Sequence, residues 1–388
     1  MGIDPRIQAL GDEVTRWRRS LHEQPELGYD VHNTARFVAD KLRSFGCDEV
    51  TEGIGRTGVV AVIHGRRGPG GKAIGLRADM DALPLEEETN LPYRSKVTGK
   101  MHACGHDGHT AMLLGAARHL AATREFDGTV VAIFQPAEEG GAGGKAMVDD
   151  GMMERWNIAE VYGMHNMPGI PVGRIALRPG PIMAAADEFV IAIEGKGSHA
   201  AAPHLGIDPI IVGVHIINAL QTITSRNVDP LHSLVVSTTM FHAGTAFNII
   251  PTRAELVGTV RTLDPGVRSM AEARLREIAA GTARLFGANA EVSYRYGYPA
   301  TVNHAREAAL ATGIAREVFG AAAVDGDTMP MMGGEDFSYM LEARPGAYLF
   351  IGNGDSAGLH NPGYDFNDAA LPYGMQMFTA LAQARTAG

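Results

Sequence analysis

Cysteine is scarce in this sequence, which contains only Cys47 and Cys104 among 388 residues. Two cysteines do not supply the disulfide framework typical of small secreted domains, and free thiols are typical of a reducing compartment. The first residues, MGIDPRIQALGDEVTRW, are polar and lack the apolar segment of a secretory signal. We therefore expect a cytoplasmic protein in which a free thiolate can serve as a ligand.

Long apolar runs and an excess of basic residues are also missing. No apolar run approaches the roughly 18 residues that a membrane span needs. The formal net charge is −10 and there is no basic cluster, so we expect no nucleic-acid partner and no membrane partner. Hydrophobic residues make up 45% of the chain and charged residues 20%, which is typical of a globular protein. A chain of 388 residues predicts two domains.

The sequence does contain a dense group of metal-binding residue types. Residues 102–109 read HACGHDGH, with three histidines, one cysteine and one aspartate in eight positions. Gly105 and Gly108 allow such side chains to converge on one point. Cys104 and His106 are two apart, so they face the same way if the backbone is extended. A helical pattern over 110–123 follows. The alternative interpretation is a reduced structural cysteine beside surface histidines.

Apolar strands predict the fold class. The runs 58–63, 73–76 and 129–134 are largely apolar and are flanked by helical patterns, and a further short strand is predicted over 160–164. Such runs are typical of a sheet buried on both faces, so we expect an α/β catalytic domain with a mostly parallel sheet flanked by helices. Three strands in succession end in potential donors, within RADMDALP, QPAEEGGAGG and HNMP. Active sites of such sheets lie at the carboxyl ends of the strands.

The pattern changes at position 186. From there to 296 the predicted order is strand, helix, two strands, helix and strand, which is the ferredoxin-like α+β unit. We therefore predict a discontinuous catalytic domain, 1–185 and 297–388, with an inserted lid and dimerisation domain, 186–296. The lid is expected to close over substrate with hinges near Ala186 and Gly297. It is also expected to form a homodimer or a higher homo-oligomer.

Donors from several predicted loops could share a metal centre. One thiolate, three imidazoles and one carboxylate are offered by Cys104, His106, Glu139, His165 and His360. A structural zinc site takes four ligands, usually at short paired spacings, whereas two divalent ions with a shared water fit this dispersed set. Zn, Mn, Co, Ni or Fe suit the mixed donors better than Mg or Ca. Glu138, beside Glu139, is placed to take a proton from that water.

Seven motifs in order carry a resemblance to a known family. They are RADMDALP, HACGHDGH, QPAEEGGAG, GKGSHAAAPH, NIIP, GGEDFS and LHNP, and they span nearly the whole chain. Together they resemble the zinc-dependent amidohydrolase and carboxypeptidase family, and the second motif is similar to that of the hippurate hydrolase branch. The resemblance implies hydrolysis of the amide bond of N-acyl-L-amino acids. It also implies that the five donors are ligands of two divalent ions and that Glu138 is the general base.

One position departs from the more distant peptidases of that superfamily. Those proteins have a histidine ligand two residues before the aspartate that Asp81 matches, whereas this chain has Asp79 there. We interpret Asp79 and Asp81 as carboxylates that orient the metal ligands rather than as ligands themselves.

The resemblance also implies substrate contacts. His199 is similar to a family histidine that supports the carbonyl oxygen, often from the partner subunit, although a lone histidine is commonly structural. Asn248 and Arg261 resemble contacts to the substrate carbonyl and carboxylate, and Gly333 and Gly334 are expected to contact substrate as well. Because the chain is net negative, a carboxylate must be held by a local guanidinium. The alternative for Arg261 is an exposed strand arginine.

Three other functions compete with the leading hypothesis. The first is a dipeptidase or carboxypeptidase of the same family. The second is a cysteine amidase that uses Cys104 with His106 or His109, whose activity would resist chelators and be sensitive to alkylation. The third is a non-catalytic metal-binding protein, which would bind metal without turnover.

Overall fold

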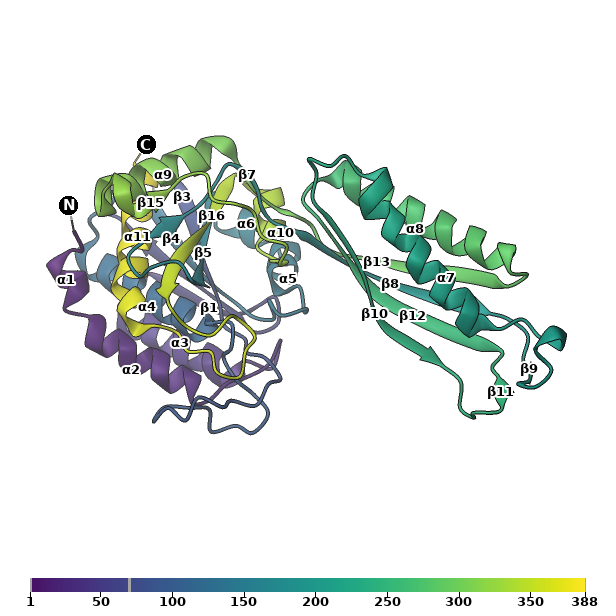
Figure 1. The fold of residues 1–388 in the computed structure, drawn as a ribbon. Coiled ribbons are helices and arrows are strands. Elements are labelled where there is room, and N and C mark those ends of the chain that lie inside the picture. Colours follow the sequence, from purple (N-terminus) through teal and green to yellow (C-terminus); the bar gives the residue numbers. More distant parts are fainter. Residues whose placement is uncertain (1, 69–70, 388) are drawn as a thin grey trace. The chain divides into compact units, whose positions relative to one another are not determined.

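The computed structural model describes residues 2–68 and 71–387. The chain divides into two compact units. Unit 1 comprises Met1–Gly180, Val302–Met329 and Asp336–Gly388, and unit 2 comprises Pro181–Thr301 and Pro330–Glu335. Each unit has its own sheet, and the elements of both are labelled in Figure 1.

Unit 1 is built on an eight-stranded sheet with the order β1-β2-β4-β3-β5-β16-β6-β15. Its strands are β1 (Glu49–Ile54), β2 (Gly58–His64), β3 (Ala73–Asp79), β4 (Thr129–Gln135), β5 (Ile158–Pro168), β6 (Ile175–Ala176), β15 (Val324–Asp325) and β16 (Gly346–Gly354). The central strands β4, β3, β5 and β16 are parallel to their neighbours in this group. Nearly all their residues are buried, as the apolar runs predict, and the expected fold class is confirmed.

Helices flank this sheet (Figure 1). They are α1 (Pro5–Gln8), α2 (Gly11–His22), α3 (His32–Ser44), α4 (His106–Thr123), α5 (Gly143–Asp149), α6 (Met152–Arg155), α9 (Ala305–Phe319), α10 (Ser338–Ala343) and α11 (Leu371–Arg385). Helix α4 contacts α2, α3 and α11 as well as the strands, and it is buried on almost every side. It begins at His106, four residues before the predicted start, because Gly105 takes a left-handed conformation (φ +86°) and turns the chain into the helix.

Unit 2 has a four-stranded antiparallel sheet with the order β10-β12-β8-β13. Its main elements in chain order are β8 (Ala185–Glu194), α7 (Pro209–Thr222), β10 (Leu234–Ala243), β12 (Arg253–Thr262), α8 (Pro265–Leu285) and β13 (Asn289–Tyr298). This is the strand-helix-strand-strand-helix-strand order of a ferredoxin-like unit. Asp208 and Asp264 cap the two helices by accepting hydrogen bonds from backbone N–H groups in their first turns.

One face of the unit 2 sheet packs against its helices. Buried and exposed residues alternate along β8 and β12, and the buried ones, such as Phe189 and Leu256, form a core with α7 and α8. The other face of β12 carries Glu255 and Arg261. A short ribbon, β9 (Ser198–His199) with β11 (Ile249–Ile250), completes the unit. Among the described residues of both units, no helix is long and apolar enough to cross a membrane.

Candidate metal centre

The donors of unit 1 lie at one edge of its sheet. Asp79 ends β3, Glu138 and Glu139 follow β4, and His165 lies in the last third of β5. Cys104 immediately precedes α4, whose first residue is His106. Because the carboxyl ends of neighbouring parallel strands meet at the same edge, segments distant in the sequence converge there.

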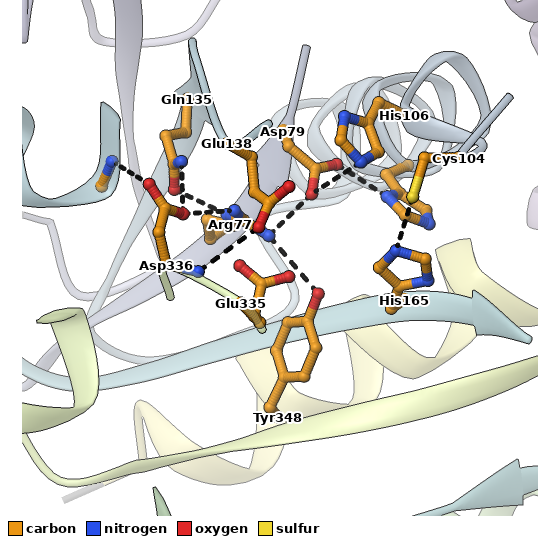
Figure 2. Close-up of polar contacts among 12 residues, drawn as sticks. Arg77, Asp79, Cys104, His106, Gln135, Glu138, His165, Glu335, Asp336 and Tyr348 are labelled. Carbon is orange, nitrogen blue, oxygen red and sulfur yellow. Dashed lines mark hydrogen bonds and ion pairs between the residues drawn. The ribbon is translucent and has the colours of Figure 1, made fainter. Parts of the chain in front are cut away.

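The five predicted metal ligands form two overlapping groups. In each group every pair of ligand atoms lies within 4.8 Å: Cys104, His106 and His165 make one group, and Cys104, Glu139 and His360 the other. The Cys104 Sγ lies 3.3 Å from the Nε2 atom of His165, and Figure 2 shows this contact. The structure therefore brings all five donors together, with Cys104 common to both groups.

Asp79 and Asp81 contact the donor residues or the backbone that carries them. Asp79 Oδ1 accepts a 2.6 Å hydrogen bond from His109 Nδ1, and its Oδ2 lies 3.7 Å from His106 Nε2. Asp81 accepts hydrogen bonds from the backbone N–H groups of Glu138 and Glu139, at 3.0 and 3.1 Å. Asp81 thus holds the loop that carries both glutamates. Asp79 also forms a close group with His106 and His109, so its carboxylate is within reach of a cation.

Glu138 lies beside the ligand groups. Its carboxylate forms a group within 4.8 Å with His106 and Glu139, and its Oε1 accepts a 3.4 Å hydrogen bond from the Asp336 N–H. The preceding Ala137 has a φ of +54°, a conformation that costs a residue with a Cβ energy. His360 is also left-handed (φ +62°). Such strained residues cluster at functional sites, and here they lie in two of the loops that carry donors.

Burial and charge oppose each other in this cluster. Burial disfavours charge on His106, but the nearby Asp79 and Cys104 outweigh it and raise the His106 pKa well above its usual value. Burial raises the pKa of the Cys104 thiol and lowers the pKa of His165. Contacts with Cys104 and Glu139 raise the pKa of His360 to about 10. The site therefore holds strongly interacting ionisable groups, of which Cys104, His106 and His165 are buried and His360 is exposed.

The donor set fits a bound cation. Within the described part of the chain, both ring nitrogens of His106 and the Oε1 of Glu139 are buried without a hydrogen-bond partner. A buried polar atom without a partner costs roughly 1–3 kcal/mol, so such atoms point to a missing ligand. Lone pairs of an imidazole and a carboxylate beside a cysteine sulfur are the donors that a divalent transition metal accepts.

Sequence reasoning missed a buried network next to Glu138. Arg77 is fully buried, and its guanidinium donates to Asp79 Oδ2, Gln135 Oε1 and Asp336 Oδ1 at 2.8, 2.8 and 3.1 Å. Asp336 accepts a further bond from the Gly144 N–H at 2.8 Å. The side chains of Arg77, Asp79, Gln135 and Asp336 lie around Glu138 in Figure 2. The available signal was an arginine inside the apolar strand AIGLRAD, because arginine is almost never fully buried unless it is paired.

The predicted substrate-binding residues of unit 2 fall at two separate places. His199 and Asn248 lie together: the His199 Nδ1 accepts from the Ala201 N–H at 3.0 Å, and the Asn248 carbonyl accepts from the Ala200 N–H at 3.0 Å. Both side chains are exposed.

Arg261 lies near the other end of β12. It pairs with Ala186, whereas Arg253, at the end nearer to β9, pairs with Glu194. A Cβ on Gly334 would lie 3.0 Å from the Ala186 Cβ, and the Gly333 carbonyl accepts from the Ala184 N–H at 2.9 Å. At about 3.3 Å per residue, Arg261 is roughly 25 Å from Arg253 along the strand. One copy of unit 2 therefore groups Arg261 with the two glycines and keeps His199 apart.

Comparison with known proteins defines the family. Residues 75–384 match Peptidase family M20/M25/M40. The chain is 44% identical over 382 residues to the hippurate hydrolase of Campylobacter jejuni, covering 98% of this chain and 99% of that one. It is 44% identical over 351 residues to thermostable carboxypeptidase 1 of Saccharolobus solfataricus, covering 89% and 87%.

A solved structure is similar over 98% of the chain. The Bacillus subtilis YXEP protein, described as a dinuclear metal binding peptidase from the M20 family, has a TM-score of 0.85 and 36% identity, covering 98% of this chain and 99% of that one. The chain therefore belongs to peptidase family M20/M25/M40. It is a hydrolase, and the resemblance drawn from the motifs is confirmed.

Proposed function

We propose that this protein hydrolyses the amide bond of N-acyl-L-amino acids of the hippurate type at a centre of two divalent metal ions. The observation that carries the proposal is the pair of overlapping donor groups with Glu138 beside them. The name of the Campylobacter hippurate hydrolase and the dinuclear Bacillus protein support it. The proposed ligands are Cys104, His106, Glu139, His165 and His360.

The metal ions would supply Lewis-acid polarisation of the amide carbonyl and would lower the pKa of water to about 7. Glu138 accepts the proton of the attacking water at its carboxylate and delivers it to the leaving nitrogen. The backbone N–H groups that Asp81 binds keep the Glu138 loop in place during this transfer. The mixed sulfur, nitrogen and oxygen donors favour Zn, Mn, Co or Ni over Mg or Ca. A free thiol ligand favours action in the reducing cytoplasm.

Arg261 is proposed to bind the carboxylate of the substrate, with Gly333 and Gly334 as neighbouring contacts. Its guanidinium is half-buried, and burial lowers its pKa without removing its charge. His199 and Asn248 are proposed to act on the carbonyl oxygen from the partner subunit. Their separation from Arg261 along β12 supports this arrangement, because one copy of unit 2 cannot place both groups on one small substrate.

The surface of unit 2 supports a dimer. Strand β10 is an edge of the sheet, and α7 beside it exposes Ile211 and Val214 at 50% and 44% of their surface. On β10 itself, Met240 and Phe241 are also exposed. An apolar edge of this kind is a template for pairing with another chain, so we propose a two-fold dimer through this face.

Replacement of Glu138 by glutamine tests the proposed base. The variant should keep two metal ions per chain and lose turnover of N-benzoylglycine by roughly 10²–10⁴-fold, the usual contribution of a general base. Glu139→Gln is the matched control: it should lose metal as well as activity. Metal content by elemental analysis and initial rates check both. Turnover of Glu138→Gln at the parent rate would rule out the assignment.

A carboxypeptidase is the second candidate, because the Saccharolobus carboxypeptidase is as similar as the hippurate hydrolase over the part it matches. A panel of benzoyl-, acetyl-, long-acyl- and indoleacetyl-amino acids, with dipeptides and longer peptides, separates the two. Faster cleavage of peptides than of any acyl-amino acid would favour the carboxypeptidase.

A further inference from the structure

A buried asparagine connects the segments that carry the metal ligands. Asn166 has no exposed surface. Its Nδ2 donates to the carbonyl oxygen of Cys104 at 2.7 Å, and its Oδ1 accepts a 2.6 Å hydrogen bond from the Tyr364 hydroxyl. Its Nδ2 also lies 3.1 Å from His109 Nε2. Every polar atom of this side chain therefore has a partner on another segment.

Asn166 and its partners together belong to three of the donor-bearing segments. Asn166 directly follows His165 on β5, its amide holds the backbone of Cys104, and Tyr364 lies four residues after His360. The loops of Cys104 and His360 also meet directly, since the His360 N–H donates to the Ala103 carbonyl at 2.8 Å. Loss of the Asn166 amide would release the contacts that hold β5 to both loops.

The backbone of Asn166 orients two imidazole rings. Its carbonyl oxygen lies 2.6 Å from His165 Nδ1, so that nitrogen must carry the proton, which leaves Nε2 with the lone pair that faces Cys104. Its N–H donates to His109 Nε2 at 2.9 Å. His109 therefore donates from Nδ1 to Asp79, and the chain of hydrogen bonds runs on to that carboxylate.

The close approach around Asn166 depends on Gly105. A Cβ on Gly105 would lie 2.2 Å from Asn166 Nδ2 and 2.6 Å from the Tyr364 hydroxyl, far inside contact distance. The fully buried Tyr364 ring closes the other side. The hydrogen bonds fix the orientation of the amide, because a flipped amide would set its oxygen against the Cys104 carbonyl oxygen.

We propose that Asn166 is a positioning residue for the metal centre: its side-chain amide fixes the separation of the Cys104, His165 and His360 segments. The inference rests on the proposed function, because it takes those residues as metal ligands. Partners behind the ligands hold the ligands in the geometry that the metal needs, and their loss usually costs 10–100-fold in metal affinity or activity. A buried asparagine that only satisfied the backbone would affect folding instead.

Two variants test the proposal, with metal affinity as the readout. Asn166→Ala keeps the backbone contacts and removes the amide, and Tyr364→Phe removes only the hydroxyl that binds Asn166 Oδ1. Affinity is measured by competition with a chelator, using Zn²⁺ and Co²⁺. We expect Asn166→Ala to weaken metal binding by roughly 10–100-fold and Tyr364→Phe to weaken it by less. The Cys104-to-cobalt absorption should shift in both.

The matched control is Tyr162→Phe. Tyr162 lies on the same strand, is fully buried and donates its hydroxyl to Glu160 at 2.9 Å, away from the donors. The Tyr162→Phe substitution should leave the metal affinity unchanged. The double variant Asn166→Ala/Tyr364→Phe should bind metal as Asn166→Ala does, because Asn166→Ala already removes the hydrogen bond that Tyr364→Phe breaks.

The outcomes separate this inference from the proposed function. Parent-like metal affinity and cobalt absorption in both Asn166→Ala and Tyr364→Phe would overturn the positioning role, whatever the parent catalyses. A loss of affinity equal in Tyr162→Phe and Tyr364→Phe would also overturn it, because the effect would then come from folding. If the parent binds two ions and hydrolyses no acyl-amino acid, the proposed function fails. The metal affinities of the variants relative to the parent still decide the role of Asn166 in that case. A parent that binds no metal would overturn both.

Discussion

At the scale of single residues, the two cysteines offer a direct test of ligand identity. Cys104 is buried among histidines and is common to both donor groups, whereas Cys47 lies outside them. Cys104→Ser should lower metal content below two ions per chain, because a hydroxyl is a poorer ligand than a thiolate for these metals. Cys47→Ser should keep the parent content. Elemental analysis of both purified variants checks this, and unchanged metal in Cys104→Ser would contradict the ligand role.

His22 predicts a pH dependence of folding stability. The fully buried ring lies 2.8 Å from Asp107 and 3.2 Å from Glu87, with the Arg18 charge also nearby. Burial disfavours its charged form, but the two carboxylates outweigh burial and Arg18 and raise the pKa of His22 to about 9, from 6.5 when unfolded.

A raised pKa stabilises the fold as long as His22 is protonated in the folded state, because the folded state binds that proton more tightly than the unfolded state does. The contribution of His22 is therefore complete below pH 6.5, declines between 6.5 and about 9, and is lost above that. It amounts to about 3 kcal/mol at most. Denaturant unfolding of the parent and of His22→Gln should give a difference that shrinks over this window. A difference that stays constant from pH 6 to pH 9.5 would contradict the prediction.

The metal-binding chemistry of the site could be predicted from residue types, whereas the hydrogen bonds that hold the ligands in place could not. Cysteine, histidine and glutamate are common metal ligands, so Cys104 and His360 could be predicted as ligands before the structure showed that they lie close together. Apart from the bond of Arg77 to Asp79, the side-chain contacts described above for Arg77 and Asn166 reach residues that are 57 to 259 positions away. An arginine inside an apolar strand is a local signal for Arg77, but the residues that it and Asn166 bind depend on which strand ends meet, and nothing local in the sequence marks them.

At the scale of elements, the buried strands of unit 1 were predictable because their apolar runs are continuous. The short strands β6 and β15 have only two residues each and leave no such pattern. The start of α4 was missed because Gly105 and the donors were read as loop, although they lead directly into the first turn. Strand β5 is longer than the predicted strand, 160–164, and continues beyond it at both ends.

The pairing of β5 and β16 leads to a prediction for Gly346. A Cβ at this position would lie 1.9 Å from the backbone oxygen of Val161, which cannot move without opening the parallel pair. Gly346→Ala should therefore destabilise the fold by about 1–3 kcal/mol. Gly313→Ala is the control: at this exposed position within α9, the new Cβ would have no atom within 4 Å from the described residues outside its own stretch of helix, so the change should stabilise by about 0.5–1 kcal/mol. Urea unfolding measures both, and equal effects would contradict the account.

At the scale of the whole molecule, the strand-helix order of unit 2 could be predicted from periodicity and helix caps. The compact unit differs from the predicted domain, 186–296, in that it runs from 181 to 301 and includes 330–335. The latter segment joins through backbone contacts, such as the bridge between Met183 and Met331. It has no pattern that marks it in the sequence. The roles of this unit as lid and dimer contact remain predictions.

Dimerisation is testable through the exposed face of α7. Ile211→Lys with Val214→Lys should give a monomer, because two charges then replace apolar surface at the proposed contact. If His199 acts from the partner subunit, kcat/KM should fall by roughly 10²–10³-fold, the usual cost of removing one oxyanion contact. Light scattering measures the oligomeric state of the double variant, and initial rates measure its kcat/KM. A fully active monomer would contradict a site shared between subunits. As a control, the metal content of the double variant should equal that of the parent.

The central claim is that distant loops of unit 1 bring their donors to one pair of ions that hydrolysis requires. It is tested most directly by adding Zn²⁺ or Mn²⁺ back to metal-free protein while the rate of N-benzoylglycine hydrolysis is measured. We predict no activity without metal, a rise with added metal and a plateau at two ions per chain. Full activity of the metal-free protein, as a cysteine amidase would show, would contradict the account.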